Sequence, residues 1–329
     1  MKKHNKYVEI VMTYNADLNV MGLKSSGMVL DVLKEHYEKV EVTVIKNESD
    51  LVELIERNPD IVLSGIKYLG FNEDSVKKDS LDKIWFSEYL EERGILCTGS
   101  SRSALEYDFD KTLAKEKMQE LDVSTAPFFL AEPGQYMTSE SIPLSFPLFI
   151  KPIYEGGGRG IDSQSVINDF EGYHKKVNDI FNQFETPALV EKFLNGREFT
   201  VVIIGGDHDN LTAMPIEIIA VSNEEGQKVR GLKVKKADTE KPIYIEDDEL
   251  RESVSELARN AFKALGARDY GRIDIRMDDE GGLHFLEANL MPGMSRHYGD
   301  LSRSCTINNI MTYEEMILKI VELGLTRTL

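Results

Sequence analysis

The segment GRIDIRMDDEGGLHFLEANLMPGM, residues 271–294, constrains the fold of this chain more than any other. It contains two strand-like runs of alternating apolar and polar residues, separated by the turn sequence DDEGG. Side chains alternate between the faces of a strand, so Glu287 and Asn289 share one face, and Asp274 joins them if the strands pair. A carboxylate inside such a strand needs a partner. The segment therefore predicts a β-hairpin with three oxygen ligands on one face.

These three side chains offer carboxylate and amide oxygens, with no His or Cys among them. Such hard ligands suit Mg2+, which keeps some of its waters and also binds substrate phosphates. The PGM sequence that follows predicts a sharp turn, which brings backbone N–H groups to the same place. The alternative is an ordinary hairpin with a solvated acidic face.

Composition places the chain among globular proteins. With 329 residues, 41% hydrophobic and 29% charged, it can bury two or three cores. The net charge of -18 argues against nucleic acid as a general partner. No apolar run reaches the length of a membrane span, and the N-terminus reads as a strand rather than a signal peptide. Cys97 and Cys305 form neither a disulfide framework nor a metal site, so we expect a cytoplasmic protein.

Strands and helices alternate in the first third of the chain, which predicts a small parallel sheet covered by helices. The expected strands are 7–13, 40–45 and 59–65, and the expected helices are 26–38, 49–58 and 80–94.

The rest of the chain reads as two α+β units, which gives three domains at 1–98, 99–194 and 195–329. Helices are expected at 101–122, 170–184, 249–267 and 312–324. Strands are expected at 146–152, 187–194, 197–206, 211–221 and 228–236, besides the hairpin.

A glycine-rich loop follows the strand that ends near Lys151. Gly156, Gly157, Gly158 and Gly160 allow positive φ and a close approach of the backbone to phosphate. The loop is no Walker A motif, because no G-K-[ST] follows, and no Rossmann fingerprint, because no helix opens at its third glycine. It predicts a lid over phosphates, with Lys151 beside them; the alternative is a mobile hairpin tip.

Other charged residues are candidates for the same site. Glu191, next to Lys192 and flanked by apolar residues, could accept from an adenine amino group, and Glu198 could hold ribose hydroxyls. Arg272 shares a strand face with Asp274, where an arginine suits a developing oxyanion. Lys111, on a charged helix, and Lys233, in a basic strand-like run, are further cations; for all but Arg272 a solvated surface position is the alternative.

Taken in order, these segments resemble the ATP-grasp superfamily, and within it the D-alanine–D-alanine ligase group. The resemblance covers the chain from about Leu96 to its end and, loosely, the N-terminal unit. The segment CTGSSRSALEYDFDKTLAKEKM resembles the family's TGS…A…DK…K pattern, and FIKPIYEGGGRGI resembles KP-x-x-EGSS-x-G. LVEKFLNGREFTV resembles the adenine hinge, and GRIDI…FLEANLMPGM matches nearly residue for residue. The implied fold is α/β, with an N-terminal parallel domain and two α+β subdomains that clasp ATP.

The resemblance also implies roles for individual residues. ATP contacts are implied for Lys111, Lys151, Glu155, Gly157, Gly158, Glu191, Lys192, Leu194 and Glu198. Asp274, Glu287 and Asn289 are implied as ligands of two Mg2+ ions, with Mn2+ as an alternative metal. Arg272 and the Gly293 backbone are implied as oxyanion donors. Lys233, or Lys235 or Lys236 in a neighbouring register, matches a strand lysine that reaches the γ-phosphate or substrate.

The chain departs from the family where substrates bind. The N-terminal GG-x-S-x-E-H segment is absent, and the H-G-x-x-GED loop is reduced to SGIKYLGFNED. The paired serines of the lid are Gly157 and Gly158, the expected tyrosine is Val234, and a Ser-Leu pair is Tyr298-Gly299. In the family these positions recognise two D-alanines and hold the lid. The ATP half is thus kept, and the amino-acid half is rebuilt.

The predicted function is an ATP-dependent carboxylate–amine ligase that works through an acyl phosphate and joins amino acids or a peptide other than two D-alanines. The alternatives are a true D-alanine–D-alanine ligase of cell-wall synthesis with divergent contacts, and an ATP-binding regulatory protein without turnover. Arg159 and Arg296 suggest a larger or more acidic substrate, unless both point to solvent. We expect small-molecule partners and no nucleic acid or membrane. The residues do not fix the oligomeric state, and the resemblance leaves a homodimer open because dimers are common in the family.

Overall fold

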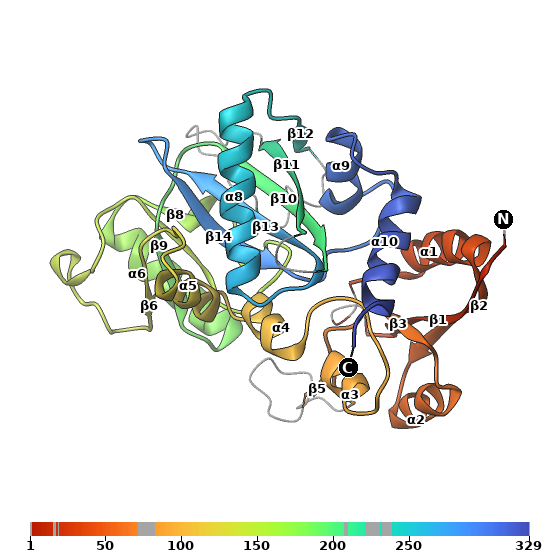
Figure 1. The fold of residues 1–329 in the computed structure, drawn as a ribbon. Coiled ribbons are helices and arrows are strands. Elements are labelled where there is room, and N and C mark those ends of the chain that lie inside the picture. Colours follow the sequence, from red (N-terminus) through yellow and green to blue (C-terminus); the bar gives the residue numbers. More distant parts are fainter. Residues whose placement is uncertain are drawn as a thin grey trace.

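The computed structural model describes residues 2–15, 18, 20–71, 83–206, 210–220, 231 and 239–328. Within these ranges the chain forms three lobes in a row, coloured red to orange, yellow to green, and green to blue in Figure 1. The third lobe in chain order lies in the middle of the row. The C-terminal end of the chain lies beside the N-terminal lobe. None of the described helices combines the length and the apolar character that a membrane crossing requires.

The N-terminal lobe is a parallel sheet in the order β2-β1-β3, as predicted. Its strands are β1 (His4–Thr13), β2 (Tyr37–Ile45) and β3 (Ile61–Ser64), with helices α1 (Leu23–His36) and α2 (Glu48–Arg57). Asn47 caps α2 in a reciprocal capping box with Asp50, which satisfies two of the free N–H groups at the start of the helix.

The helix predicted at 80–94 is wrong at residues 83–85, which are not helical. Residues 72–82 lie outside the described ranges, and Ile84–Trp85 form a short strand, β5, that pairs with β4 (Tyr68–Leu69). Helix α3 runs only from Phe86 to Glu91. The Trp85 ring lies 5.8 Å from Tyr68 and 6.3 Å from Phe109, so tertiary aromatic packing overrides the local helical pattern.

The second lobe is an antiparallel sheet in the order β6-β9-β7-β8, covered on one face by α6 (Phe170–Phe184). Its strands are β6 (Phe128–Ala131), β7 (Leu148–Pro152), β8 (Val166–Ile167) and β9 (Ala188–Lys192), with single 3-10 turns at Ser139–Ser141 and Ser163–Ser165. Ile150 and Val190 pack in the core under α6. Lys151 and Glu191, one position further along each strand, therefore face the opposite way, toward the third lobe.

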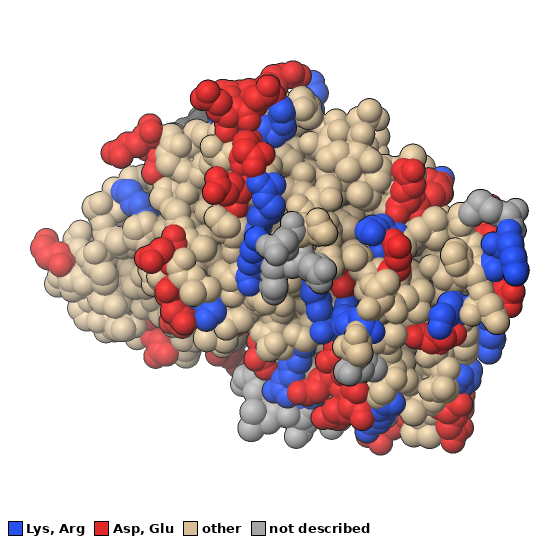
Figure 2. Space-filling view, viewed as in Figure 1, with Lys and Arg blue, Asp and Glu red and all other residues tan. Residues whose placement is uncertain are grey.

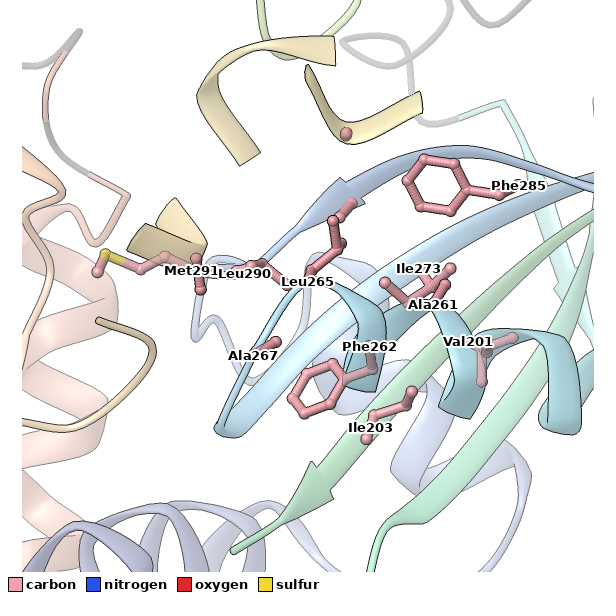
Figure 3. Close-up of a cluster of buried hydrophobic side chains, with 14 of the residues drawn as sticks. Val201, Ile203, Ala261, Phe262, Leu265, Ala267, Ile273, Phe285, Leu290 and Met291 are labelled. Atoms are coloured by element: carbon pink, nitrogen blue, oxygen red, sulfur yellow. The ribbon is translucent and has the colours of Figure 1, made fainter. Parts of the chain in front are cut away.

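The third lobe is a five-stranded antiparallel sheet in the order β12-β11-β10-β13-β14. The strands are β10 (Glu198–Gly205), β11 (Thr212–Ile219), β12 (Lys241–Ile243), β13 (Asp269–Met277) and β14 (Leu283–Asn289). Helix α8 (Asp248–Ala264) covers one face, where Phe262 belongs to the same buried cluster as Val201, Ile203 and Ile273 (Figure 3). The other face is apolar at one end, where Val202, Ile204 and Met214 belong to a second buried cluster, and carries polar side chains at the other end.

Helix α8 carries its charges in the order that its dipole favours. Acidic side chains gather at its upper end, where Asp248 and Glu249 form the first turn, and basic side chains run down from there toward Lys263 (Figure 2). Each charge near the matching helix end contributes about 0.3–1 kcal/mol.

Two elements connect the lobes. The helical stretch predicted at 101–122 divides at Asp110 into α4 (Arg102–Phe109) and α5 (Lys111–Glu120), because the Asp110 carboxylate caps α5. Both helices pack in the core beneath α8, although the predicted boundaries at 98 and 194 place them with the second lobe. The domain boundaries at residues 98 and 194 therefore stay a prediction. At the end of the chain, α9 (Asp300–Ile307), which was not predicted, packs against β10 and β11, and α10 (Tyr313–Leu325) packs against α1 and β3 of the N-terminal lobe.

Candidate active site

The predicted hairpin exists, and its polar side chains share one face. In the ladder between β13 and β14, Asp274 stands opposite Glu287, and Arg272 stands opposite Asn289. Directly opposed residues in an antiparallel pair project to the same side. Thr200 of β10 is paired with Asp274 from the other edge of β13, so the same face extends across three strands.

A β-bulge between Asp274 and Ile275 leaves Leu286 without a partner in the register. A bulge re-aims the side chains beside it. Leu286 and Glu287, although adjacent, both line the same cavity. The bulge thus supplies an apolar surface next to the carboxylate, which strict alternation would not allow.

The charged side chains of this face are held in place by their neighbours. Asp274 is buried; one carboxylate oxygen accepts from the Thr200 hydroxyl at 2.9 Å, and the other from the Arg272 guanidinium at 2.9 Å. Arg272 also donates to Asp300 at 3.3 Å. Two residues beyond Asp274 along β13, Arg276 donates to the buried Glu198 at 3.1 Å.

The side chain of Asn289 shows whether the polar face of β13 and β14 fits a metal ion. Its Oδ1 atom is buried, and the described residues offer it no hydrogen-bond partner. A buried polar atom without a partner is costly unless something absent from the protein atoms satisfies it. No group of three His, Cys, Asp or Glu gathers within the described ranges, so the protein would supply two carboxylates and an amide. That set fits Mg2+, whose remaining positions belong to water and phosphate oxygens.

A buried triad faces the hairpin from the second lobe. The Glu191 carboxylate lies 2.7 Å from the Lys115 ammonium and 2.8 Å from the Lys151 ammonium, and all three residues are almost fully buried. Burial raises the pKa of Glu191, but the two lysines more than offset it, so this pKa lies below its ordinary value. Burial lowers the pKa of Lys115. Burial also acts against the charge of Lys151, but Glu191 and Glu287 more than offset it, so the pKa of Lys151 lies above its ordinary value. The dry setting therefore holds a charged Glu191–Lys151 pair with Lys115 beside it.

Lys111 joins the glycine-rich loop to the hairpin. Its ammonium donates to the carbonyl oxygens of Glu155 at 2.6 Å and Ile153 at 3.3 Å, and lies 3.9 Å from the Glu287 carboxylate. Lys111 is the first residue of α5, where the helix dipole disfavours a cation. This placement costs stability, which favours a functional role.

The glycine-rich loop has a backbone conformation that favours glycine at three positions. Gly157, Gly158 and Gly160 have φ values of 66°, 81° and 72°. A Cβ atom on Gly160 would lie 2.4 Å from a Pro152 side-chain atom. The turn is thus fixed closely against the end of β7.

Three adjoining cavities run along this face. Cavity A, about 660 Å³, is lined by Ala126, Phe149, Lys151, Ile161, Glu191, Lys192, Phe193, Leu194, Glu198, Asp274, Arg276, Leu286 and Glu287. Cavity B, about 1980 Å³, is lined by Asn15, Leu18, Val20, Lys67, Tyr68, Asp108, Phe109, Lys111, Tyr154, Glu155, Gly156, Gly157, Arg159, Arg272, Glu287, Ala288, Asn289, Met291 and Gly293. Cavity C, about 890 Å³, is lined by Val20, Ser25, Glu240, Arg272, Pro292, Gly293, Ser295, Tyr298, Gly299, Asp300 and Arg303.

The cavities connect through residues that they share. Glu287 lines both A and B, and Arg272 and Gly293 line both B and C. Cavity A, about half of whose lining residues are apolar, therefore leads past the hairpin carboxylates to a larger chamber, and from there past Arg272 to a third.

Some predicted residues lie apart from this centre. The Lys192 ammonium donates to the Ser145 and Phe146 carbonyl oxygens at 3.2 and 3.3 Å, at the border of cavity A. Arg296 lines none of the three cavities and pairs with Glu314 at 2.5 Å. Lys233, Lys235 and Lys236 lie outside the described residues.

A sequence model of the family described as D-ala D-ala ligase C-terminus matches residues 118–322. The chain belongs to this family. A D-alanine–D-alanine ligase from Hydrogenovibrio crunogenus is 25% identical over 93% of this chain and 90% of its own length. One from Acinetobacter baumannii is 29% identical over 73% of this chain and 74% of its own.

Solved structures share the fold. A D-alanine–D-alanine ligase from Bacillus anthracis complexed with ATP aligns with a TM-score of 0.73 at 20% identity, over 98% of both chains. The VanG D-Ala:D-Ser ligase from Enterococcus faecalis aligns at 0.72 and 18% identity, over 98% of this chain and 100% of its own. The predictions of a D-alanine–D-alanine ligase-like ATP-grasp fold and of an ATP-dependent carbon–nitrogen ligase are confirmed.

Sequence reasoning missed several members of the site. Lys115 follows Lys111 by four residues, a spacing that places both on one helix face and could have singled it out. Thr200 and Arg276 follow Glu198 and Asp274 by two, so strand alternation alone could have placed them on the polar face. Nothing local signals the bulge at Leu286.

Proposed function

We propose that this member of the family joins a carboxylate to an amine at the expense of ATP, with its adenosine in cavity A, its triphosphate at the hairpin and its other substrates in cavities B and C. The observation that carries the proposal is the continuous polar face of β10, β13 and β14 opposite the lysines of α5 and β7. Phosphoryl transfer is mostly positioning and charge neutralisation, which such a face can provide.

In this proposal the nucleoside end rests on the second lobe. Phe149, Leu194 and Leu286 supply apolar surface for the base, and Glu198, at the border of cavity A, supplies a carboxylate for the ribose. Glu191 and the Lys192 backbone face the base edge, as the resemblance implies. Glu191 also holds Lys151 at the phosphate end, since the pair is 2.8 Å apart.

Asp274, Glu287 and Asn289 would hold the magnesium, with the number of ions and the use of Mn2+ part of the proposal. When bound, the metal supplies charge neutralisation for the phosphates. Lys111 and the glycine N–H groups of the lid, among them Gly157 and Gly158, bind phosphate oxygens, and Glu155 supports the lid. Lys233, which lies outside the described residues, is proposed to reach the γ-phosphate or substrate.

The proposed reaction has two steps. A substrate carboxylate in cavity B attacks the γ-phosphorus, which gives an acyl phosphate and ADP. An amine then attacks the acyl carbon, and phosphate leaves. Arg272 and the Gly293 N–H donate to the oxyanion that forms, and both lie where cavities B and C meet. A closed lid keeps water from the acyl phosphate.

We propose amino-acid substrates other than a pair of D-alanines, because the wall of the reaction cavities differs from the family pattern. Tyr298 lines cavity C where the family has a serine, and Tyr68, Tyr154 and Arg159 line cavity B. The alternative is a D-alanine–D-alanine ligase with changed contacts, which the names of the curated relatives favour.

A substrate screen separates the two readings. ADP release is measured with ATP, MgCl2 and all pairs drawn from the twenty L-amino acids, D-alanine and D-serine, and products are identified by mass spectrometry. We expect a pair other than D-alanine with itself to give the highest rate. D-alanyl-D-alanine as the main product would overturn the substrate assignment. If none of the pairs supported ADP release, the ligase function itself would be overturned.

A further inference from the structure

We infer that the first turn of α9 selects the amine substrate as an α-amino acid, with Asp300 binding its ammonium group and accepting a proton from it, and Arg303 binding its carboxylate. This inference rests on the proposed ligase function. It concerns two residues that neither the hairpin motif nor the family match singles out.

The cavities place the two substrates on opposite sides of the oxyanion donors. Arg272 and Gly293 line both cavity B and cavity C, so the acyl carbon lies at the junction. Cavity B adjoins Lys111 and Glu287, where the phosphates are proposed to lie, and therefore holds the acyl phosphate. Cavity C has no such neighbour among its described lining residues, and an amine entering there approaches the acyl carbon from the side away from ATP.

Asp300 and Arg303 present opposite charges to cavity C from one side of α9. They are three residues apart, so their Cβ atoms lie roughly 5–6 Å from each other on the same helix face. An α-amino acid carries its ammonium and carboxylate on one carbon, and its two charges can therefore meet both side chains at once. The Arg303 guanidinium also lies 5.7 Å from the Tyr298 ring centre, a cation–π distance that steadies it beside the cavity.

The position of Asp300 suits proton transfer as well as binding. Its side chain is 13% exposed and lies 3.3 Å from Arg272, the proposed oxyanion donor. The ammonium must lose a proton before nitrogen can attack. Cavity C is lined by two carboxylates, Glu240 and Asp300, and Asp300 is the one that Arg272 holds at 3.3 Å beside the reacting centre.

The step balances without another reactant. One ammonium proton passes to Asp300 and from there to solvent. The nitrogen lone pair forms the C–N bond, the acyl C–O bond breaks, and the second proton leaves the nitrogen with the phosphate as hydrogen phosphate. The products are an amide and inorganic phosphate.

The competing explanation is that Asp300 only positions Arg272 through their ion pair. The two roles differ in what they do to hydroxylamine, an amine that is mostly unprotonated at neutral pH and has no carboxylate. A positioning defect slows every acyl transfer at Arg272. Loss of a proton acceptor and ammonium ligand slows only amines that arrive as cations.

The test compares Asp300→Asn with wild type, using the best amino-acid pair of the substrate screen and, in parallel, hydroxylamine in place of the amine. We expect amide formation to fall about 10²-fold or more, the usual range for a lost general base, while hydroxamate formation stays within about 3-fold of wild type. An equal loss with both amines would overturn the assignment in favour of a positioning role, and full activity with both would refute it. Asp279→Asn, on the exposed hairpin turn, is the matched control.

Arg303→Met tests the carboxylate half and keeps the apolar stem of the side chain. We expect the KM of the amino acid to rise about 10- to 100-fold, as for a lost charge-assisted hydrogen bond, with kcat little changed. The KM of the corresponding amino-acid amide, which lacks the carboxylate, should not change. An equal rise for both, or no rise, would overturn the role; Arg296→Met is the control, since Arg296 faces Glu314. Wild type that forms no hydroxamate from any carboxylate would instead contradict the ligase function itself.

Discussion

The buried triad of Lys115, Glu191 and Lys151 makes a quantitative prediction about stability. Glu191 holds two ammonium groups at 2.7 and 2.8 Å in a region that excludes water. Glu191→Gln keeps the side-chain shape but leaves both lysines without their shared carboxylate. Breaking a buried ion pair from one side costs about 3–5 kcal/mol. We expect the free energy of unfolding to fall by that amount.

A double-mutant cycle tests the cause. Lys115→Met alone leaves the Glu191–Lys151 pair and removes the 2.6 Å hydrogen bond to Thr125, so a loss of about 1–3 kcal/mol is expected. Adding Lys115→Met to Glu191→Gln removes one of the two unmatched cations. The double variant should therefore be more stable than Glu191→Gln alone. Denaturant unfolding followed by circular dichroism measures all four proteins.

The stabilisation that Glu191 contributes should depend on pH in one direction. The pKa of Glu191 lies below its ordinary value of 4.5, because the two lysines outweigh the effect of burial. Its contribution to stability is therefore present above pH 4.5 and is lost as the pH falls through the lowered pKa. The difference between wild type and Glu191→Gln should be constant near neutrality and shrink below that pH. Losses that simply add in the cycle, or a difference that persists in acid, would refute the triad as the cause.

Three further predictions concern the metal and the lid. Thr200→Val removes the hydrogen bond that orients Asp274, and should raise the Mg2+ concentration for half-maximal ADP release about 10- to 100-fold; an unchanged requirement would argue against Asp274 as a ligand. Gly160→Ala combines a φ of 72° with a Cβ 2.4 Å from Pro152, so a strain of about 1–2 kcal/mol should raise the KM for ATP about 10-fold, and a normal KM would show that the loop does not serve ATP. EDTA should abolish ADP release, and MgCl2 but not CaCl2 should restore it; activity in EDTA would exclude the metal.

The hairpin face could be predicted from sequence because its information is local. A period of two residues places Asp274, Glu287 and Asn289 on one side of paired strands, and the turn between them sets which strands pair. The register confirms that arrangement. The parallel N-terminal sheet could likewise be predicted, because strands and helices alternate over a short stretch of sequence.

The rest of the centre depends on contacts between distant segments. Lys115, on α5, contacts Glu191 of β9 only after these distant segments pack together. Their separation in the sequence does not indicate that the two side chains lie 2.7 Å apart. The bulge at Leu286 is a property of the pairing rather than of either strand. Asp300 opens a short helix whose few residues give too little periodicity for prediction. Trp85 shows the reverse case, in which aromatic neighbours turn a helical pattern into a strand.

The central claim is that the hairpin carboxylates serve phosphoryl transfer, and Glu287→Gln tests it most directly. Glu287 lines both cavity A and cavity B and lies 3.9 Å from Lys111. The measurement is kcat for ADP release with saturating substrates, beside thermal unfolding of the same sample and Glu280→Gln as the control on the exposed turn. The account predicts a fall in kcat of about 10²-fold or more with an unchanged melting temperature and a normal control. A Glu287→Gln protein with the kcat of wild type would contradict it.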